Sequence, residues 1–416
     1  MFRILFFIVF ISYLNLISCA VNENLSEVKC GADILLKDRL NILEGKNIGI
    51  VTNHTAILKN GTHLVDTLSG IKNFKILALF GPEHGIRGDA PDGHSITDGK
   101  DPKTGIPVYS LYGKINKPTK EMLKDINLLI FDIQDIGARF YTFISTLFYT
   151  LQAGAENNIP VIVLDRPNPI GGINVSGNIT EKNYLSFVGI APIPIQHGLT
   201  IGELANFFNQ EGLLGKDLKA DLQIIKIENW NRKDLFSDTD LKWINPSPNM
   251  VNLDAAMVYP GLCLLEGTNI SEGRGTDKPF LTFGAPYINN KELIQNLEKY
   301  KFEGIKFLPV EYTPVDIPNM ASNPKYKDNK CFGIQLAIDK SKNFDAVKLG
   351  ITIIYEVNKL YPEKFEFRKK SIDRLYGSSI LEEYIRSGKS LDDIFSTWSP
   401  ELENFTKNRN KYLLYN

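Results

Sequence analysis

Four continuous apolar runs limit what this chain can fold into. They lie at Asn47–Val51, Lys75–Phe80, Asn127–Asp132 and Pro160–Asp165, and none alternates regularly between apolar and polar residues. Strands of this kind belong in a parallel sheet that helices cover on both faces. The segments 118–124 and 138–156 are long enough for crossover helices. The sequence therefore predicts an α/β fold whose larger domain has a Rossmann-like, mainly parallel sheet.

A second, smaller domain is expected in the C-terminal third. A chain of 416 residues exceeds what one hydrophobic core usually supports. After about residue 285 the pattern changes: Ile305–Tyr312 and Cys331–Ile338 are typical of antiparallel strands, and a helical tail follows. We expect residues 31–285 to form the Rossmann-like catalytic domain and residues 286–416 to form a smaller α+β domain.

The N-terminus has the features of an export signal. A short basic start precedes the apolar run Ile4–Leu14, which is too short to span a bilayer. The tetrapeptide Leu16–Cys19 resembles a bacterial lipobox, in which the cysteine is lipidated. We therefore expect a signal peptide at 1–19, a lipid anchor on Cys19, a polar tether at 20–30 and an exported, membrane-anchored protein. The alternative is a plain signal peptide with an incidental cysteine.

The composition gives no indication of nucleic-acid binding, of a disulfide framework or of a bound metal. There are 47 basic and 48 acidic residues, so no excess of positive charge indicates nucleic-acid binding. The other three cysteines are far apart and the five histidines are scattered, which argues against a disulfide framework and a structural zinc site. We expect no metal and no cofactor.

Polar residues follow all four predicted strands, where ligands of open parallel sheets bind. They are Asn53 and His54, then Glu83, His84 and Arg87, then Gln134, Arg139 and Tyr141, and finally Asp165, Arg166 and Asn168. His197 follows a further apolar run at 190–195. We expect these residues to line a substrate-binding cleft, although each has a structural alternative, such as a salt bridge for Arg139 or anchoring of a loop for Asp165.

Glu83 is the leading candidate for a catalytic carboxyl group. It lies in Gly81-Pro-Glu-His-Gly85, where proline and glycine favour a tight turn that a substrate can approach. Its structural alternative is to cap a turn or to pair with Arg87. By contrast, Thr200-Ile-Gly-Glu203 has the spacing of a capping box, so Glu203 is expected to cap a helix.

A second catalytic carboxyl group has three candidates. Glu266 and Glu272 lie with Asn269 and Arg274 in a glycine-rich loop, and Asp132 ends a predicted strand. The loop is not a phosphate-binding loop, because neither nucleotide-binding glycine pattern occurs between a strand and a helix. No Gly-x-Ser-x-Gly motif is present, which disfavours a serine hydrolase.

Together these motifs resemble the NamZ family of exo-β-N-acetylmuramidases. The resemblance is carried by Thr52–Thr55, Phe80–Gly88, Phe131–Thr142, Leu164–Pro169, Gln196–Thr200 and Leu265–Thr276, and it extends over almost the whole mature chain. It implies an active site between two domains, with Glu83 as the catalytic glutamate. It also implies release of terminal N-acetylmuramic acid from the non-reducing end of peptidoglycan fragments such as MurNAc-GlcNAc. Arg139 would then be a candidate to bind the lactyl carboxylate of this sugar.

Two other functions are compatible with part of the pattern. A membrane-tethered protein could bind muropeptides in the same cleft without catalysis. A nucleotide-dependent enzyme would suit a Rossmann-like fold, but the missing glycine fingerprint argues against it. Release of free sugar would exclude the binding protein, and the absence of any nucleotide-induced thermal shift would exclude the nucleotide-dependent enzyme.

Overall fold

The larger sheet has the predicted parallel architecture. The computed structural model describes residues 27–88 and 98–416, so Cys19 and the expected signal peptide lie outside the described residues. In this part of the chain, strands are ordered β3-β4-β2-β1-β5-β6-β7, and only β3 and β4 pair antiparallel. The strands are β1 (Asn47–Thr52), β2 (Lys75–Gly81), β3 (Gly99–Lys100), β4 (Pro107–Ser110), β5 (Leu128–Asp132), β6 (Val161–Leu164) and β7 (Leu222–Ile225).

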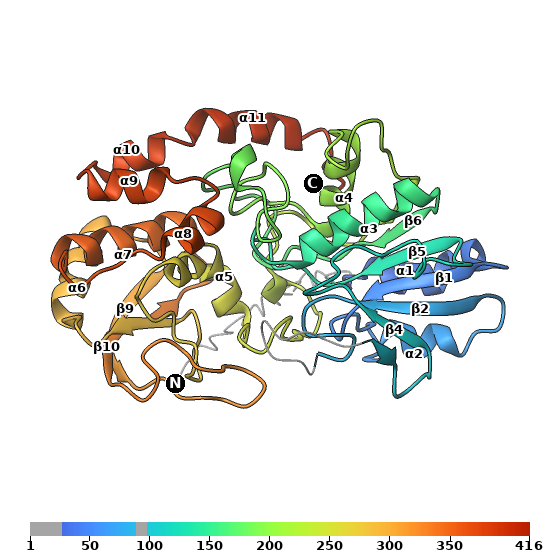
Figure 1. The fold of residues 1–416 in the computed structure, drawn as a ribbon, viewed down its shortest axis with the longest axis horizontal. Coiled ribbons are helices and arrows are strands. Elements are labelled where there is room, and N and C mark those ends of the chain that lie inside the picture. Colours follow the sequence, from blue (N-terminus) through green and yellow to red (C-terminus); the bar gives the residue numbers. More distant parts are fainter. Residues whose placement is uncertain (1–26, 89–97) are drawn as a thin grey trace, which may run out of the picture.

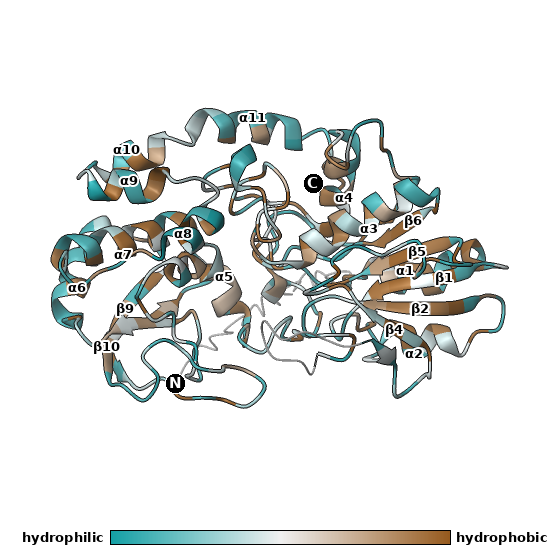
Figure 2. Cartoon of the chain, in the orientation of Figure 1, coloured by the Kyte–Doolittle hydropathy of each residue, from teal (hydrophilic) through white to brown (hydrophobic). Residues whose placement is uncertain are grey.

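Helices cover this sheet on both faces, as its apolar strands require. Ile48, Ile50 and Ile130 pack in one core with α1 (Gly31–Asp38) and α2 (Leu64–Ser69). On the other face, Val51, Phe131 and Val163 pack in the core that contains α3 (Phe143–Asn157) and α4 (Ile201–Gln210). Figure 1 shows α3 and α4 along one side of the strands, and Figure 2 shows that the strands are largely apolar. The carboxyl ends of β1, β2, β5 and β6 therefore meet at one edge, as predicted.

Two predicted helices differ from the structure. The segment 118–124 forms turns, and α3 begins at Phe143 rather than near 138. Residues just before α3 are held in an irregular segment, because Ala138 pairs with Gln196 and the Arg139 N–H donates to the carbonyl of Ile195 at 2.8 Å. The capping box at α4 is confirmed: Thr200 Oγ1 accepts from the Glu203 N–H at 3.2 Å, and Glu203 Oε2 accepts from the Thr200 N–H at 3.0 Å.

The second unit is built on an antiparallel sheet ordered β8-β10-β9. Its strands are β8 (Thr282–Ala285), β9 (Ile305–Tyr312) and β10 (Cys331–Ile338), and the two strands predicted there pair antiparallel along their full length. Helix α6 (Asn290–Leu297) packs on β9 and β10, and α7 (Ala346–Leu360) packs against α6 and α5 (Leu253–Leu262). Because α5 packs on α7 and β8 pairs with β10, this unit begins before residue 285, where we expected the boundary.

Helices α5 and α7 approach closely at two glycines. A Cβ atom on Gly261 would lie 1.7 Å from the carbonyl oxygen of Ala346, and one on Gly350 would lie 2.2 Å from that of Gly261. Side chains at either position would force the helices apart. This contact fixes the short helix η4 (Cys263–Gly267), which directly follows α5 and carries Glu266.

The C-terminal helices return the chain to the first unit. They are α8 (Lys369–Tyr376), α9 (Ile380–Arg386), α10 (Leu391–Ser396) and α11 (Ser399–Arg409), and Figure 1 shows α11 crossing from the second unit to the first. The rings of Phe405 and Tyr412 pack against Phe207 of α4. The remaining short helices are η1 (Leu40–Leu43), η2 (Lys182–Tyr184), η3 (Phe236–Asp238) and η5 (Glu298–Tyr300).

The end of the expected tether is part of the folded structure. Val28 is buried with Ile227 and Trp230, and the Lys29 N–H donates to the carbonyl of Glu228 at 3.1 Å. Cys30 precedes α1 and is buried. Residues 28–30 are therefore held against the first unit instead of ending a free tether. Within the described ranges, no helix combines the length and apolar character needed to cross a membrane.

Candidate active site

A cleft of about 740 Å³ lies where the first unit meets α5 and η4. The first unit contributes the turn after β2, the start of α3 and the segment around Phe187, while the second contributes η4, Arg274 and Phe280. Five predicted site residues line this cleft: Glu83, His84, Tyr141, Glu266 and Arg274. Two of them are carboxyl groups from different units, so the cleft has a composition suited to acid–base chemistry.

Glu83 is positioned by an unusual turn at the end of β2. His84 has φ 71° and Gly85 has φ 76°, so two successive residues adopt the left-handed conformation. For a non-glycine residue this conformation is uncommon, and it is often found at functional sites. The Gly85 N–H closes the turn on the carbonyl of Pro82 at 3.0 Å. The Glu83 side chain then accepts a hydrogen bond from Thr142 Oγ1 at 2.9 Å, immediately before α3.

Aromatic rings form much of the cleft wall. Tyr259 makes edge-to-face contacts with Phe140, Tyr141 and Phe280, at centroid distances of 5.5, 5.7 and 4.7 Å. These four residues line the cleft. Ligand sites commonly combine such apolar and aromatic walls with a few oriented polar groups. The wall therefore offers apolar ring edges and faces against which the ring of a substrate can pack.

Glu266 is linked to Glu272 through shared cations. Arg274 Nη2 lies 2.9 Å from Glu266 Oε1, and Arg274 Nε lies 3.7 Å from Glu272 Oε1. Lys325 Nζ lies 3.0 Å from Glu272 Oε2. Burial and the nearby Glu272 raise the pKa of Glu266 against the opposing effect of Arg274. Burial also acts to raise the pKa of Glu272, but Lys325 and Arg274 outweigh it and lower that pKa. Such opposite shifts in neighbouring carboxyl groups are typical of catalytic sites.

Comparison with known proteins identifies the family of this chain. The family described as "Exo-beta-N-acetylmuramidase NamZ, N-terminal" matches residues 48–254, and its C-terminal counterpart matches residues 257–415. Peptidoglycan beta-N-acetylmuramidase NamZ of Bacillus subtilis (strain 168) is 46% identical over 390 residues, covering 94% of this chain and 92% of that protein. This chain belongs to the NamZ family of exo-β-N-acetylmuramidases.

Solved structures extend the agreement to the fold. Two crystal structures of DUF1343-family proteins from Bacteroides fragilis NCTC 9343 are 36% and 34% identical to this chain, with TM-scores of 0.86 and 0.76. Each comparison covers 94% of this chain and 99% of the solved one. The two-unit α/β fold is therefore shared. In this NamZ-family chain, Glu83 lies in the N-terminal family region and Glu266 in the C-terminal one.

Asp132 and Arg166 form a buried ion pair away from the cleft lining. Arg166 Nε lies 2.6 Å from Asp132 Oδ1, and its Nη2 lies 3.0 Å from Oδ2. Asp132 is fully buried, and Arg166 is only 5% exposed. The second carboxyl group expected from the sequence is therefore better placed at Glu266, since Asp132 is already paired in the interior.

Arg139 has a structural role in place of the expected contact with a substrate carboxylate. Its guanidinium is fully buried and donates to four backbone carbonyls, those of Asn178, Ile193, Leu375 and Tyr376. Burial lowers the pKa of Arg139 to about 9, which still leaves the group charged at neutral pH. Because Leu375 and Tyr376 belong to α8, Arg139 holds the second unit against the first.

Asp165, Asn168 and His197 also serve the interior of the first unit. Asp165 accepts hydrogen bonds from the Thr200 and Tyr415 hydroxyls and from the Gly202 N–H. Asn168 Nδ2 donates to the carbonyl of Leu199 at 3.0 Å. His197 is fully buried, and its Nδ1 accepts from the Leu199 N–H at 3.2 Å. These bonds anchor the loop before α4, so the three side chains are not in the cleft.

The other predicted binding residues stabilise loops. Asn53 accepts from the Thr55 hydroxyl, and His54 Nε2 contacts the carbonyl of Asn245 at 2.7 Å. Arg87 binds Asp101 and Asp66. Gln134 donates to the carbonyls of Asp135 and Pro167, and Asn269 donates to the carbonyl of Lys364. These side chains hold the frame around the cleft.

Several cleft residues were not singled out from the sequence. Thr142 ends the motif Phe131–Thr142, and Ser247 lies between two prolines, Pro246 and Pro248, so both had a local signal that could have pointed to them. Tyr259, Phe280 and Leu375 lie in ordinary apolar contexts, and only the tertiary fold brings them to the cleft.

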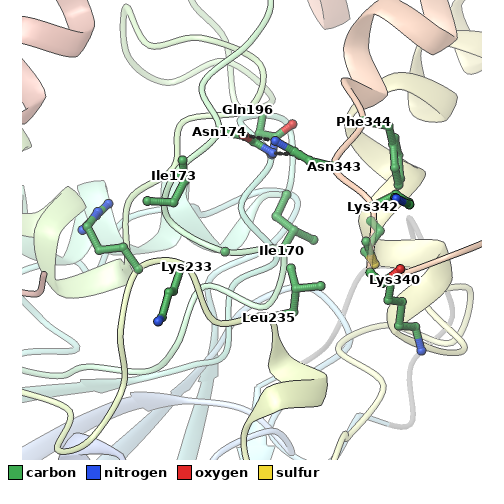
Figure 3. Close-up of a pocket in the computed structure, with 14 residues that line it drawn as sticks. Ile170, Ile173, Asn174, Gln196, Lys233, Leu235, Lys340, Lys342, Asn343 and Phe344 are labelled. Carbon is green, nitrogen blue, oxygen red and sulfur yellow. Dashed lines mark hydrogen bonds between the residues drawn. The ribbon is translucent and has the colours of Figure 1, made fainter. Parts of the chain in front are cut away.

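Another cavity between the units has a different chemistry. Figure 3 shows it between Ile170, Ile173 and Leu235 on one side and the 340–344 segment on the other, with a volume of about 800 Å³. Asn174 Nδ2 donates across it to Asn343 Oδ1 at 2.6 Å. Its charged lining residues are Arg232 and three lysines, and its described lining includes no aspartate or glutamate. It therefore offers no carboxyl group for glycoside hydrolysis.

Proposed function

We propose that this chain hydrolyses the terminal, non-reducing N-acetylmuramic acid from peptidoglycan fragments such as MurNAc-GlcNAc, with Glu83 and Glu266 as its two carboxyl groups. The observation that carries the proposal is that both line one cleft, each supplied by a different family region. Membership of the NamZ family supports the reaction class. A pair of carboxyl groups flanking the scissile bond is the usual requirement for glycoside hydrolysis.

In this mechanism, Glu83 carries out the acid–base step at the glycosidic oxygen. Its fixed turn and its bond to Thr142 restrict the side chain to one side of the cleft. Glu266, oriented by Arg274, is the second carboxyl group, which assists water or the developing positive charge at the anomeric carbon. The aromatic wall around Tyr259 packs against the sugar ring and excludes water from it.

The direct test is to incubate the protein without residues 1–20 with MurNAc-β-1,4-GlcNAc and to follow free MurNAc by mass spectrometry. Glu83→Gln should lower kcat by about 10²–10⁴-fold while the melting temperature stays close to that of the wild type. Glu401→Gln, which changes an exposed glutamate on α11, is the matched control and should retain activity. Full activity of Glu83→Gln would refute its role. Binding of intact disaccharide without release of sugar by the wild type would instead favour a binding protein.

We also propose that the protein is exported and lipid-anchored through Cys19. The basic start, the apolar run and the lipobox-like tetrapeptide support this. A lipidated cysteine with several acyl chains would hold the enzyme stably at a membrane surface. Cells expressing the full chain should incorporate labelled palmitate into it, and Cys19→Ser should abolish the label. A wild-type protein that is secreted without label would contradict the anchor.

A further inference from the structure

A second groove opens directly beside the catalytic cleft. It has a volume of about 910 Å³ and shares Val188, Glu266, Arg274 and Leu375 with the cleft. Its remaining wall comes from the 322–325 segment and from α8 with its preceding residue, Arg368. A substituent on a sugar bound beside Glu266 can therefore extend into this groove.

The charges in the groove leave two arginines uncompensated. The carboxylates of Glu266 and Glu272 are balanced by Arg274 and Lys325 through the contacts described above. Arg368 and Arg374 also line the groove, and both are exposed. Within the described ranges neither makes a salt bridge; Arg374 Nε donates to the backbone carbonyl of Lys370 at 3.0 Å.

The backbone that carries the two arginines is held in a fixed position relative to the catalytic cleft. Arg368, Ser371 and Arg374 are spaced three residues apart along the start and body of α8, and all three line the groove. Residues at this spacing lie on one face of a helix. Close contact fixes α8 on η4, since a Cβ atom on Gly267 would lie 2.7 Å from Ile372 Cα. The backbone of α8 therefore keeps its position relative to η4, which carries Glu266.

We propose that Arg368 and Arg374 form a subsite for a carboxylate carried on the lactyl arm of the muramic acid. This inference rests on the proposed function and specifies how that site selects its substrate. Guanidinium groups bind carboxylates with two parallel hydrogen bonds, and the Ser371 hydroxyl adds a donor between them. The subsite also keeps the substrate's negative charge away from the two cleft glutamates, which would repel it.

The carboxylate has two chemical sources. In a peptide-free sugar it is the lactyl carboxylate itself. In a muropeptide the lactyl group is an amide, and the first free carboxylate belongs to the peptide stem. Both present the same group to the arginines, but at different distances from the sugar ring.

Three substrates distinguish these sources: MurNAc-GlcNAc, its uncharged lactyl amide, and the disaccharide with an L-Ala-D-Glu stem. We expect the Arg368→Ala/Arg374→Ala variant to lose at least about tenfold in kcat/KM on MurNAc-GlcNAc and to stay within about twofold on the amide. Raising the salt concentration should weaken the wild-type preference for the acid and have little effect on the variant. Lys369→Ala/Lys370→Ala is the matched control, because it removes the same charge from the same helix outside the groove lining.

The outcomes separate the possibilities. A loss confined to the substrate with the stem assigns the subsite to the peptide, and a loss on MurNAc-GlcNAc assigns it to the lactyl group. Losses on both acids no larger than in the lysine control would overturn the inference while leaving the proposed function intact. If the wild type releases no sugar from any substrate, the proposed function fails. Calorimetric binding of acid against amide then tests the arginines independently: a wild-type preference for the acid that the arginine variant loses supports the subsite, and an unchanged preference overturns it.

Discussion

Glu266 and Glu272 show how two nearby carboxyl groups acquire different properties in this chain. Arg274 contacts both, whereas Lys325 lies 3.0 Å from Glu272 alone. Lys325 also donates to the carbonyls of Leu265 and Ile270, which fixes it beside Glu272. Glu272 therefore keeps its negative charge, and that charge disfavours ionisation of Glu266. We infer that Glu272, which does not line the cleft itself, influences the protonation of Glu266, which does.

Replacing Glu272 by glutamine should lower the pKa of Glu266. The substitution removes a nearby negative charge, so the ionised form of Glu266 becomes easier to form. The measurement is a ¹³C NMR titration of the Glu266 carboxyl, assigned by its disappearance in Glu266→Gln. Glu311→Gln, an exposed partner of Lys330, is the control and should leave the titration unchanged. An unchanged or higher pKa in Glu272→Gln would contradict the coupling.

The sequence placed Glu83 in the cleft more accurately than it placed the surrounding residues. Its exposure could be predicted because proline and glycine mark its turn at the end of an apolar strand. Arg139, Asp165 and His197 occupy similar positions after strands, yet all three are buried. Whether a polar side chain points into a cleft or into the interior depends on partners distant in sequence, such as Tyr415 for Asp165. Local spacing does not contain that information.

At the scale of elements, Arg139 connects an irregular segment of the first unit to α8 of the second. It donates to carbonyls of two residues in each unit, so one side chain satisfies four acceptors that burial removes from water. The same helix carries Arg374 and borders the cleft through Leu375. The position of this wall of the cleft therefore depends on Arg139.

Arg139→Lys should destabilise the protein even though it conserves charge. A lysine has one donor group on a flexible chain and cannot reach four carbonyls, so several would stay buried without a partner. We expect the free energy of unfolding to fall by on the order of 3 kcal/mol in urea titrations. Arg386→Lys, which changes an exposed pair with Glu382, is the control and should change it by less than about 0.5 kcal/mol. Equal stability of both variants would show that the Arg139 contacts contribute little.

Elements were predictable where one local signal dominated. Continuous apolar runs indicate the buried strands, and a capping box indicates the start of α4. The start of α3 was placed too early because residues 138–142 have no local feature that excludes a helix. Their conformation follows from pairing of Ala138 with Gln196, which lies far along the chain. The unit boundary was placed too late for a related reason: the pairing of β8 with β10 is invisible in the sequence of either strand.

At the scale of the whole molecule, the C-terminal segment fastens the second unit to the first. Arg409 Nη1 donates to the carbonyls of Gly172 and Gly198, both at 3.1 Å. Ser176 of the first unit donates to Asp345, which caps α7 of the second. Since each unit supplies one carboxyl group to the cleft, the geometry of the site depends on these contacts. A further contact joins the Tyr415 hydroxyl to Asp165, which directly follows β6.

The hydrogen bond between Tyr415 and Asp165 should make the stability of the protein depend on pH. Its burial, together with the nearby Glu203, raises its pKa to about 7 against the effect of its hydrogen-bond donors, Tyr415, Thr200 and Gly202. A carboxyl group whose pKa rises on folding stabilises the protein in its neutral form. This contribution is fully present below the unfolded pKa of about 3.8 and is lost as pH rises through about 7. Between pH 5 and 9 the loss is on the order of 2–3 kcal/mol.

Asp165→Asn tests this because asparagine resembles the neutral acid and cannot ionise. The stability of the variant relative to the wild type should therefore rise between pH 5 and about pH 7 and then level off towards pH 9, as measured by urea unfolding at several pH values. The exposed Asp217 has φ 59°, a conformation that asparagine tolerates, so Asp217→Asn is the matched control and should follow the wild type. Parallel pH curves for Asp165→Asn and the wild type would mean that Asp165 is ionised throughout the range. The contact with Tyr415 would then be a charged hydrogen bond that holds the two units together independently of pH.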